Sequence, residues 1–245
     1  MNYDITKIKE EARTLVNELI TTTQFESVLK GTMSAAQWEY QYHDVLRAAH
    51  IRYASGASRG VIWHETSKDF VFKFDLEDDG TCWKEFNVYR NACELGLDEY
   101  FAWCAPVYKH TYQVEGCDAC SSITFYAMEY CDTNLERTSA KCIAALADRA
   151  YRFHPNWDRS DPSSHEAALS EASEWYSNAD FCDDDASFEF AGIVWGEDAA
   201  DEVQGLLWDN DVNDFHSGNW GWLNDHLVLT DYAGYHGGGD YDEEW

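Results

Sequence analysis

Basic residues are scarce in this sequence, and after Arg159 there are none. Residues 160–245 contain 22 Asp and Glu residues, and the whole chain of 245 residues carries a formal net charge of −29. A surface of this charge repels phosphate backbones and anionic lipids, which argues against nonspecific binding to nucleic acid or to a membrane surface. The charge favours a cationic partner or substrate. A solvated acidic surface that merely aids solubility is the alternative explanation.

Long apolar runs are also missing, and only three prolines occur. No stretch approaches the roughly 20 apolar residues that span a bilayer. The first residues, MNYDITKIKEEARTL, are amphipathic and lack the apolar core of a signal peptide. We therefore expect a soluble, cytoplasmic protein. Hydrophobic residues make up 45% of the chain and aromatic residues 16%, which is enough to fill a core and excludes wholesale disorder.

The eight Cys residues do not form a recognisable framework of metal ligands. Cys117 and Cys120 form a single C-x-x-C pair, and no second pair follows at a spacing suited to zinc. Reduced cytosolic thiols are the simpler interpretation, and a zinc site at this pair is the alternative.

Hydrophobic periodicity divides the chain into three parts and predicts an α+β fold. Residues 1–48 follow a helical period, with Ser34 as a candidate N-cap of the second helix. Residues 49–131 read as five antiparallel strands with one embedded helix over 82–96. Residues 132–245 read as helices followed by a short hairpin. Within them, a helix begins after Thr138 or Ser139, and the acidic, Ser-rich stretch 155–190 contains one helix near 164–177.

Lys73 is the only charged residue inside the strand sequence FVFKF. Alternation places Lys73 on one face of the strand and the three Phe residues on the other. A Lys on the solvent side of a strand is common, whereas a Lys on an inner face must find an anion. Glu85, in the helix that follows, would neutralise an inward-facing Lys73.

A glycine-containing turn precedes this strand in the sequence SGASRGV, residues 55–61. Gly56 and Gly60, with Ser58 between them, let a backbone approach a ligand closely, and successive N–H groups in such a turn can hold phosphate. An ordinary hairpin turn without a ligand is the alternative.

Three polar residues mark the segment VNDFHSGNWGWLNDHLVLTDYAG, residues 212–234. Asn219 and Asp231 carry the oxygen ligands that Mg²⁺ prefers. Asp214, five residues before Asn219, can accept a hydroxyl proton and position an acceptor. In a chain this rich in Asp, the spacing of these residues alone is weak evidence for a site. Their order after a glycine turn, a strand Lys and a helix Glu is stronger evidence.

This order resembles a protein-kinase-like fold, and DFHSGN resembles the catalytic loop of aminoglycoside-phosphotransferase-like, atypical and small bacteriophage kinases. The resemblance implies two lobes: an N-lobe over 49–131 behind a helical extension over 1–48, and an acidic C-lobe over 132–245. It also implies ATP and Mg²⁺ as cofactors.

The resemblance assigns a role to each candidate residue. Lys73 would hold the α- and β-phosphates, Glu85 would orient Lys73, and Asp214 would be the catalytic base. Asn219 and Asp231 would bind Mg²⁺. The turn residues Gly56, Ser58 and Gly60 would cover the phosphates, and the segment MEYCD, with Glu129 and Cys131, would be the hinge that pairs with adenine.

The sequence departs from the family pattern in three places. Glu85 lies only 12 residues after Lys73, so the start of the helix must be short. Val212 and Asn213 stand where His and Arg usually precede the catalytic Asp, and only 14 residues follow Asp231. We therefore expect a minimal, truncated C-lobe.

Three functions fit these features. The first is a phage-type serine/threonine kinase that acts on a basic host protein in the host cytoplasm, without binding nucleic acid or membrane. The second is a catalytically silent kinase fold that mimics the charge of DNA and inhibits a host nucleic-acid enzyme. The third is a kinase for small cationic molecules.

Overall fold

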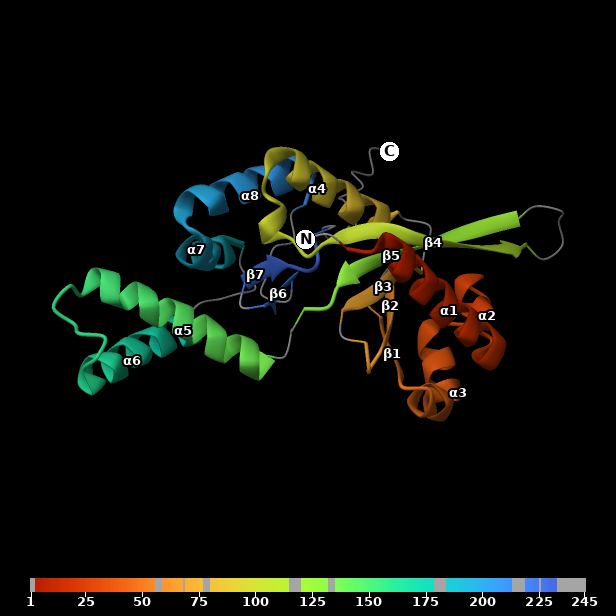
Figure 1. Cartoon of the computed structure of the whole chain (residues 1–245), viewed down its shortest axis with the longest axis horizontal. Helices are drawn as coiled ribbons and strands as arrows, with labels where there is room; N and C mark the ends of the chain where they lie inside the picture. The colour runs from red at the N-terminus through yellow and green to blue at the C-terminus, as the bar shows by residue number, and fades with distance from the viewer. Residues whose placement is uncertain are drawn as a thin grey trace, which may run out of the picture. The chain divides into compact units, whose positions relative to one another are not determined.

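The computed structural model describes residues 3–55, 59–67, 69–76, 80–114, 120–131, 135–178, 184–212, 219–224 and 226–232 (Figure 1). The chain forms two compact units. Unit 1 comprises Met1–Arg90 and Trp103–Tyr130, and unit 2 comprises Asn91–Ala102 and Cys131–Trp245. Within the described ranges, no helix is both long enough and apolar enough to cross a membrane.

Unit 1 contains the predicted five-stranded antiparallel sheet, which confirms the α+β class. Its strands are β1 (Ile51–Ser55), β2 (Arg59–His64), β3 (Phe70–Asp75), β4 (Cys104–Gln113) and β5 (Cys120–Glu129). Their spatial order is β1-β2-β3-β5-β4, and every neighbouring pair is antiparallel. The central strand β3 is therefore hydrogen-bonded on both sides.

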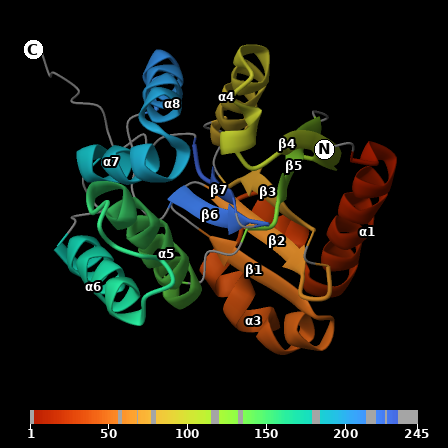
Figure 2. The same ribbon diagram turned by 60° about the vertical axis from the view of Figure 1, so that its left-hand side comes forward.

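Three N-terminal helices cover one face of this sheet (Figure 2). They are α1 (Ile5–Thr23), α2 (Phe25–Leu29) and α3 (Ala35–Ala48). Helix α3 begins with the predicted cap, because Ser34 Oγ accepts the Gln37 N–H at 3.3 Å in a capping box. The buried Trp38 indole then donates to the Thr23 carbonyl oxygen at 2.8 Å. Helices and sheet thus share one hydrophobic core.

Strand β3 alternates as the sequence predicts. Phe70, Phe72 and Phe74 are buried in the core beneath the helices, and Lys73 lies on the opposite face. The Phe74 ring contacts Phe25 edge to face, with ring centroids 5.4 Å apart. This alternation fixes which face of the sheet carries the charged side chains.

Gly60 lies directly opposite Phe74 in the β2–β3 register. A Cβ atom at Gly60 would lie 2.3 Å from Phe74 Cζ, which is far inside van der Waals contact. The residue predicted to admit a phosphate therefore also makes room for a core aromatic ring.

Replacing Gly60 with Ala is expected to lower the free energy of unfolding by about 1–3 kcal/mol, because the buried Phe74 ring must leave its position. Gly205 is the matched control, since a Cβ there meets no atom within 4 Å. Gly205→Ala should stabilise its helix by about 0.5–1 kcal/mol. Urea denaturation of both variants measures the difference, and equal stabilities would contradict this packing role.

Helix α4 (Thr81–Leu95) connects β3 to the rest of the chain and ends as predicted at Gly96, whose φ is +75°. The Leu97 N–H donates to the Ala92 carbonyl oxygen at 2.8 Å, which closes the last turn. At the other end, Asp75 Oδ1 accepts the Cys82 N–H at 2.9 Å. This bond ties the first turn of α4 to the end of β3.

Unit 2 is mostly helical. It contains the 3₁₀ turn η1 (Asp98–Tyr100), α5 (Leu135–Phe153), α6 (Pro162–Asn178), α7 (Asp184–Trp195), α8 (Glu197–Asp209) and the hairpin β6 (Trp220–Leu223)–β7 (His226–Leu229). Two expectations were wrong. Helix α5 starts at Leu135, ahead of the predicted caps, and α7 occupies the end of the stretch expected to be irregular. Helix α7 forms because it buries Phe190, whose ring lies 5.1 Å from that of Trp220.

The hairpin is joined to the segment that follows α4. The Ala102 N–H donates to the Leu229 carbonyl oxygen at 2.8 Å, and the fully buried Tyr232 hydroxyl donates to the Ala102 carbonyl oxygen at 2.8 Å. The Tyr232 ring also meets Phe101 at 90°. These bonds hold the backbone just after β7, where Asp231 lies.

Candidate functional site

A buried ion pair joins the sheet of unit 1 to α4. Lys73 Nζ lies 2.9 Å from Glu85 Oε1, and the two side chains are 10% and 0% exposed. The alternation of β3 directs Lys73 away from the aromatic core. The Asp75 contact fixes the start of α4, so that Glu85 in its second turn faces the same side of the sheet. The pairing predicted from the sequence is present, whereas the catalytic roles of both residues remain predictions.

Arg59 joins the same carboxylate, and sequence reasoning missed it. Its Nη1 lies 3.3 Å from Glu85 Oε1, and its side chain is 15% exposed. Arg59 is the first residue of β2 and lies opposite Asp75 in the β2–β3 register, as Val61 lies opposite Lys73. Side chains alternate along β2, so Arg59 lies on the same face as Val61, which is opposite Lys73. The sequence could have revealed Arg59 only if the pairing of β2 with β3 had been known.

Two neutral side chains line the surroundings of Lys73. Burial, followed by the charges of Glu85 and Asp75, raises the pKa of the Cys82 thiol far above its usual range. Tyr126 lies opposite Lys73 in the β3–β5 register, and burial raises the pKa of its hydroxyl to about 12. Both groups are therefore protonated near neutral pH, so the charges on this face come from Lys73, Arg59 and the nearby carboxylates.

Glu129, predicted to lie in an adenine-binding hinge, uses its side chain inside unit 1. The buried carboxylate accepts the Trp103 N–H at 2.7 Å and the Tyr3 hydroxyl. Burial raises the pKa of Glu129, and the Trp103 N–H partly offsets the shift. The backbone N–H of Glu129 donates to the Trp103 carbonyl oxygen. Cys131, the other predicted hinge residue, is buried at the start of unit 2.

The two predicted metal ligands lie next to each other in unit 2. The Asn219 carbonyl oxygen accepts the N–H groups of Thr230 at 2.7 Å and Asp231 at 3.2 Å. The β6–β7 hairpin produces this contact, because it folds the chain after Asn219 back on itself. Asn219 is buried and Asp231 is half-buried.

The amide oxygen of Asn219 and the carboxylate of Asp231 are ligand types that Mg²⁺ takes. The part of the chain that the structure describes contains no group of three or more His, Cys, Asp or Glu able to hold a metal. Mg²⁺ does not need such a group, because it retains several waters and takes one or two protein oxygens together with substrate phosphates. An Asn and an Asp are sufficient for that mode of binding.

Several predicted residues lie outside the described residues. Asp214 is one of them, as are Gly56 and Ser58 of the glycine turn. Cys117 of the C-x-x-C pair is another, and its neighbour Cys120 is an exposed free thiol.

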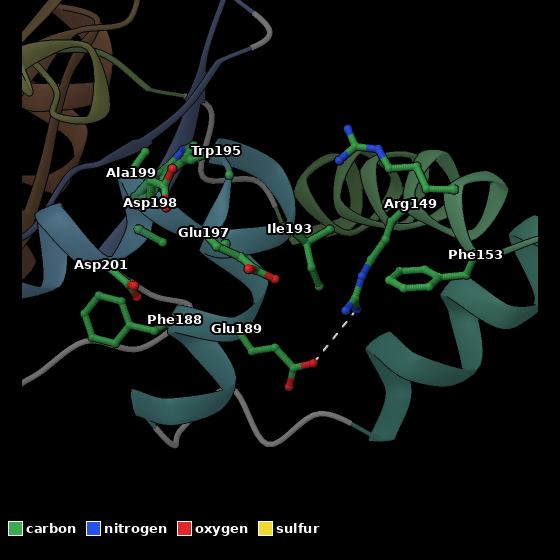
Figure 3. Close-up of a pocket in the computed structure, with 14 residues that line it drawn as sticks. Arg149, Phe153, Phe188, Glu189, Ile193, Trp195, Glu197, Asp198, Ala199 and Asp201 are labelled. Carbon is green, nitrogen blue, oxygen red and sulfur yellow. Dashed lines mark ion pairs between the residues drawn. The ribbon is translucent and has the colours of Figure 1, made fainter.

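A separate cavity of about 740 Å³ lies within unit 2, between α5, α7 and the start of α8 (Figure 3). Its charged lining consists of two arginines and four carboxylates: Arg149, Arg152, Glu189, Glu197, Asp198 and Asp201. Arg149 lies 3.9 Å from Glu189 and stacks on the Phe153 ring at 4.9 Å from its centroid. Carboxylates therefore outnumber arginines in this lining.

Comparisons of this chain with protein-family models, with curated proteins and with solved structures find no match. In unit 1, Lys73, Arg59 and Glu85 form an ionic cluster. In unit 2, the backbone N–H of Asp231 bonds to the backbone carbonyl oxygen of Asn219.

Proposed function

We propose that this protein is an ATP- and Mg²⁺-dependent phosphotransferase with a protein-kinase-like fold. The observation that carries the proposal is the Lys73–Glu85 ion pair. The free energy lost on removing two charges from water is about as large as the free energy gained from their attraction. A buried ion pair therefore contributes little to the stability of a fold. A buried Lys held by a helix Glu on a central strand is better explained by binding of phosphate, where the Glu keeps the ammonium group in position.

Asn219 and Asp231 support the metal half of the proposal. Both would contribute oxygen ligands to Mg²⁺, which, when bound, neutralises charge on the phosphates of ATP. The hairpin bonds that place Asn219 beside Asp231 fix their backbones before any ligand arrives. Such preorganisation reduces the cost of ordering the site on binding.

The chemical step assigned to this chain is transfer of the γ-phosphoryl group to a hydroxyl. The acceptor oxygen forms a bond to the γ-phosphorus while the bond from that phosphorus to the β,γ-bridging oxygen breaks, and ADP leaves with the electron pair. Asp214 accepts the proton of the acceptor hydroxyl. Lys73, oriented by Glu85, stabilises negative charge on the phosphates.

A basic protein is the acceptor that the charge favours. The net charge of −29 attracts cationic partners over a distance of about 10 Å in 0.1 M salt. The cavity in unit 2 offers carboxylates and aromatic rings to Arg or Lys side chains that flank an acceptor Ser or Thr. We therefore propose a serine/threonine kinase of the bacteriophage type that acts on a basic host protein.

The density of carboxylates also favours a second function. Residues 160–245 carry 22 Asp and Glu and no Lys or Arg, so this part of the chain could imitate the charge of DNA and occupy a basic groove. Such a protein needs no buried Lys73–Glu85 pair and no Asn219–Asp231 arrangement. The catalytic proposal accounts for both features, and we rank it first.

Nucleotide binding tests the proposal. Mg²⁺-ATP at about 100 times its Kd should stabilise the folded protein by about 2.7 kcal/mol, because only the folded state binds it. Asp231→Asn should remove most of the Mg²⁺-dependent part of the rise in melting temperature. Asp209→Asn, at the exposed C-terminal end of α8, is the charge-matched control. If millimolar Mg²⁺-ATP does not change the melting temperature of the parent protein, the phosphotransferase proposal is refuted. The acidic inhibitor then becomes the preferred function.

A further inference from the structure

Two cations from neighbouring strands meet on one carboxylate oxygen in unit 1. Lys73 Nζ and Arg59 Nη1 lie 2.9 Å and 3.3 Å from the same atom, Glu85 Oε1. Both side chains point to the face of the sheet opposite the aromatic core, because Arg59 and Lys73 are two register positions apart on paired strands. A ligand atom that reaches the Lys73 ammonium group therefore has a guanidinium close by.

The Arg59 contact is the weaker of the two. Charge-assisted N–H···O bonds are typically about 2.7–2.9 Å long, so the Lys73 distance is normal and the Arg59 distance is long. Placing two cations close together in a mostly buried position is unfavourable, and an anion that touches both reduces that repulsion.

The chemistry of arginine suits phosphate. The guanidinium remains charged at all relevant pH values and presents its donors in a planar fork that matches two oxygens of a phosphate group. The nearest carboxylate across the strands is Asp75, which lies opposite Arg59 in the register and uses Oδ1 to accept the Cys82 N–H. The contact with Glu85 therefore holds Arg59 on this face in the absence of a ligand.

We propose that Arg59 is a second phosphate-binding residue, which acts beside Lys73 and makes the site selective for polyphosphates over monophosphates. The choice of ATP as the ligand rests on the proposed function. The choice of a polyphosphate as the class of ligand does not. A single phosphate engages one cation well, whereas a di- or triphosphate can engage both. Affinity lost on removing Arg59 should therefore grow with the number of phosphates.

The test compares Arg59→Gln and Arg59→Lys with Arg52→Gln, measured by isothermal titration with ATP and AMP. Arg52 lies on β1 and pairs with Glu65 at the surface, so its substitution makes the same charge change away from this cluster. Arg59→Gln should weaken ATP binding by about 10- to 100-fold, which corresponds to the loss of a charged hydrogen bond. AMP binding should change by less than about twofold. Arg59→Lys should recover part of the ATP affinity, and Arg52→Gln should bind as the parent does.

Equal losses for ATP and AMP would mean that Arg59 merely supports Glu85, and an unchanged ATP affinity would remove it from the site; either result overturns the inference while the phosphotransferase stands. Inorganic tripolyphosphate separates the two ideas. If the parent binds tripolyphosphate at least as tightly as ATP, and Arg59→Gln weakens tripolyphosphate binding, the inference is supported and the proposed function is contradicted. A parent that binds neither ligand overturns both.

Discussion

Replacing Glu85 with Gln is expected to lower the free energy of unfolding by about 3–5 kcal/mol, because it leaves two mostly buried cations without their shared carboxylate. For a chain of this size, the melting temperature should fall by roughly 10 °C. Differential scanning calorimetry measures the change. The matched control is Glu94→Gln, which removes an exposed carboxylate from the same helix and should change the melting temperature by very little.

The partner of Glu85 provides a second check on this prediction. If Lys73 and Glu85 interact directly, the loss in the double variant Lys73→Met, Glu85→Met should be smaller than the sum of the losses in the single variants. The double variant should also fail to bind ATP, since its phosphate-binding Lys is gone. Additive losses would show that the ion pair has no energetic coupling and would weaken the argument built on it.

Replacing Asp214 with Ala is expected to reduce phosphoryl transfer by about 10²- to 10⁴-fold while ATP affinity stays within about twofold, because a general base acts on the transition state and not on nucleotide binding. Single-turnover kinetics with ATP and a basic acceptor measure the rate. The control is again Asp209→Asn, which makes the same change in charge at an exposed position. A variant that retains the parent rate would show that another group accepts the proton.

The same variant separates catalysis from inhibition by charge alone. If this protein alters its partner by phosphorylation, the effect should vanish with Asp214→Ala. If it blocks a basic groove, the effect should survive Asp214→Ala and fail when Glu197, Asp198 and Asp201 of the cavity become neutral amides. Assays of the partner's activity with both variants distinguish these outcomes.

Local patterns predicted much of unit 1 and the end of helix α4. Alternation along FVFKF was sufficient to place Lys73 opposite the aromatic core, and Ser34 and Gly96 marked helix ends through their own backbone chemistry. The strands themselves followed from short alternating segments separated by turns. Each of these features depends on residues that are close in sequence, which is why the sequence alone could indicate them, whereas the pairing of β3 with β5 joins distant segments.

Features that depend on distant residues escaped prediction. Helix α7 follows a run of Asp residues, and its stability comes from burying Phe190 against Trp220, 30 residues away. Arg59 reads as a turn residue until the register of β2 and β3 places it beside Lys73. Tertiary pairing decided both of these cases.

Transfer of the γ-phosphoryl group from ATP to an acceptor would distinguish a phosphotransferase from an acidic inhibitor. The parent protein would be incubated with Mg²⁺ and ATP labelled on the γ-phosphate, together with a lysine-rich histone as the basic acceptor. Our account predicts label on Ser or Thr of the acceptor, loss of that label when Mg²⁺ is chelated, and loss again in Lys73→Met. A parent protein that binds Mg²⁺-ATP but transfers label to no acceptor and not to itself would contradict the phosphotransferase.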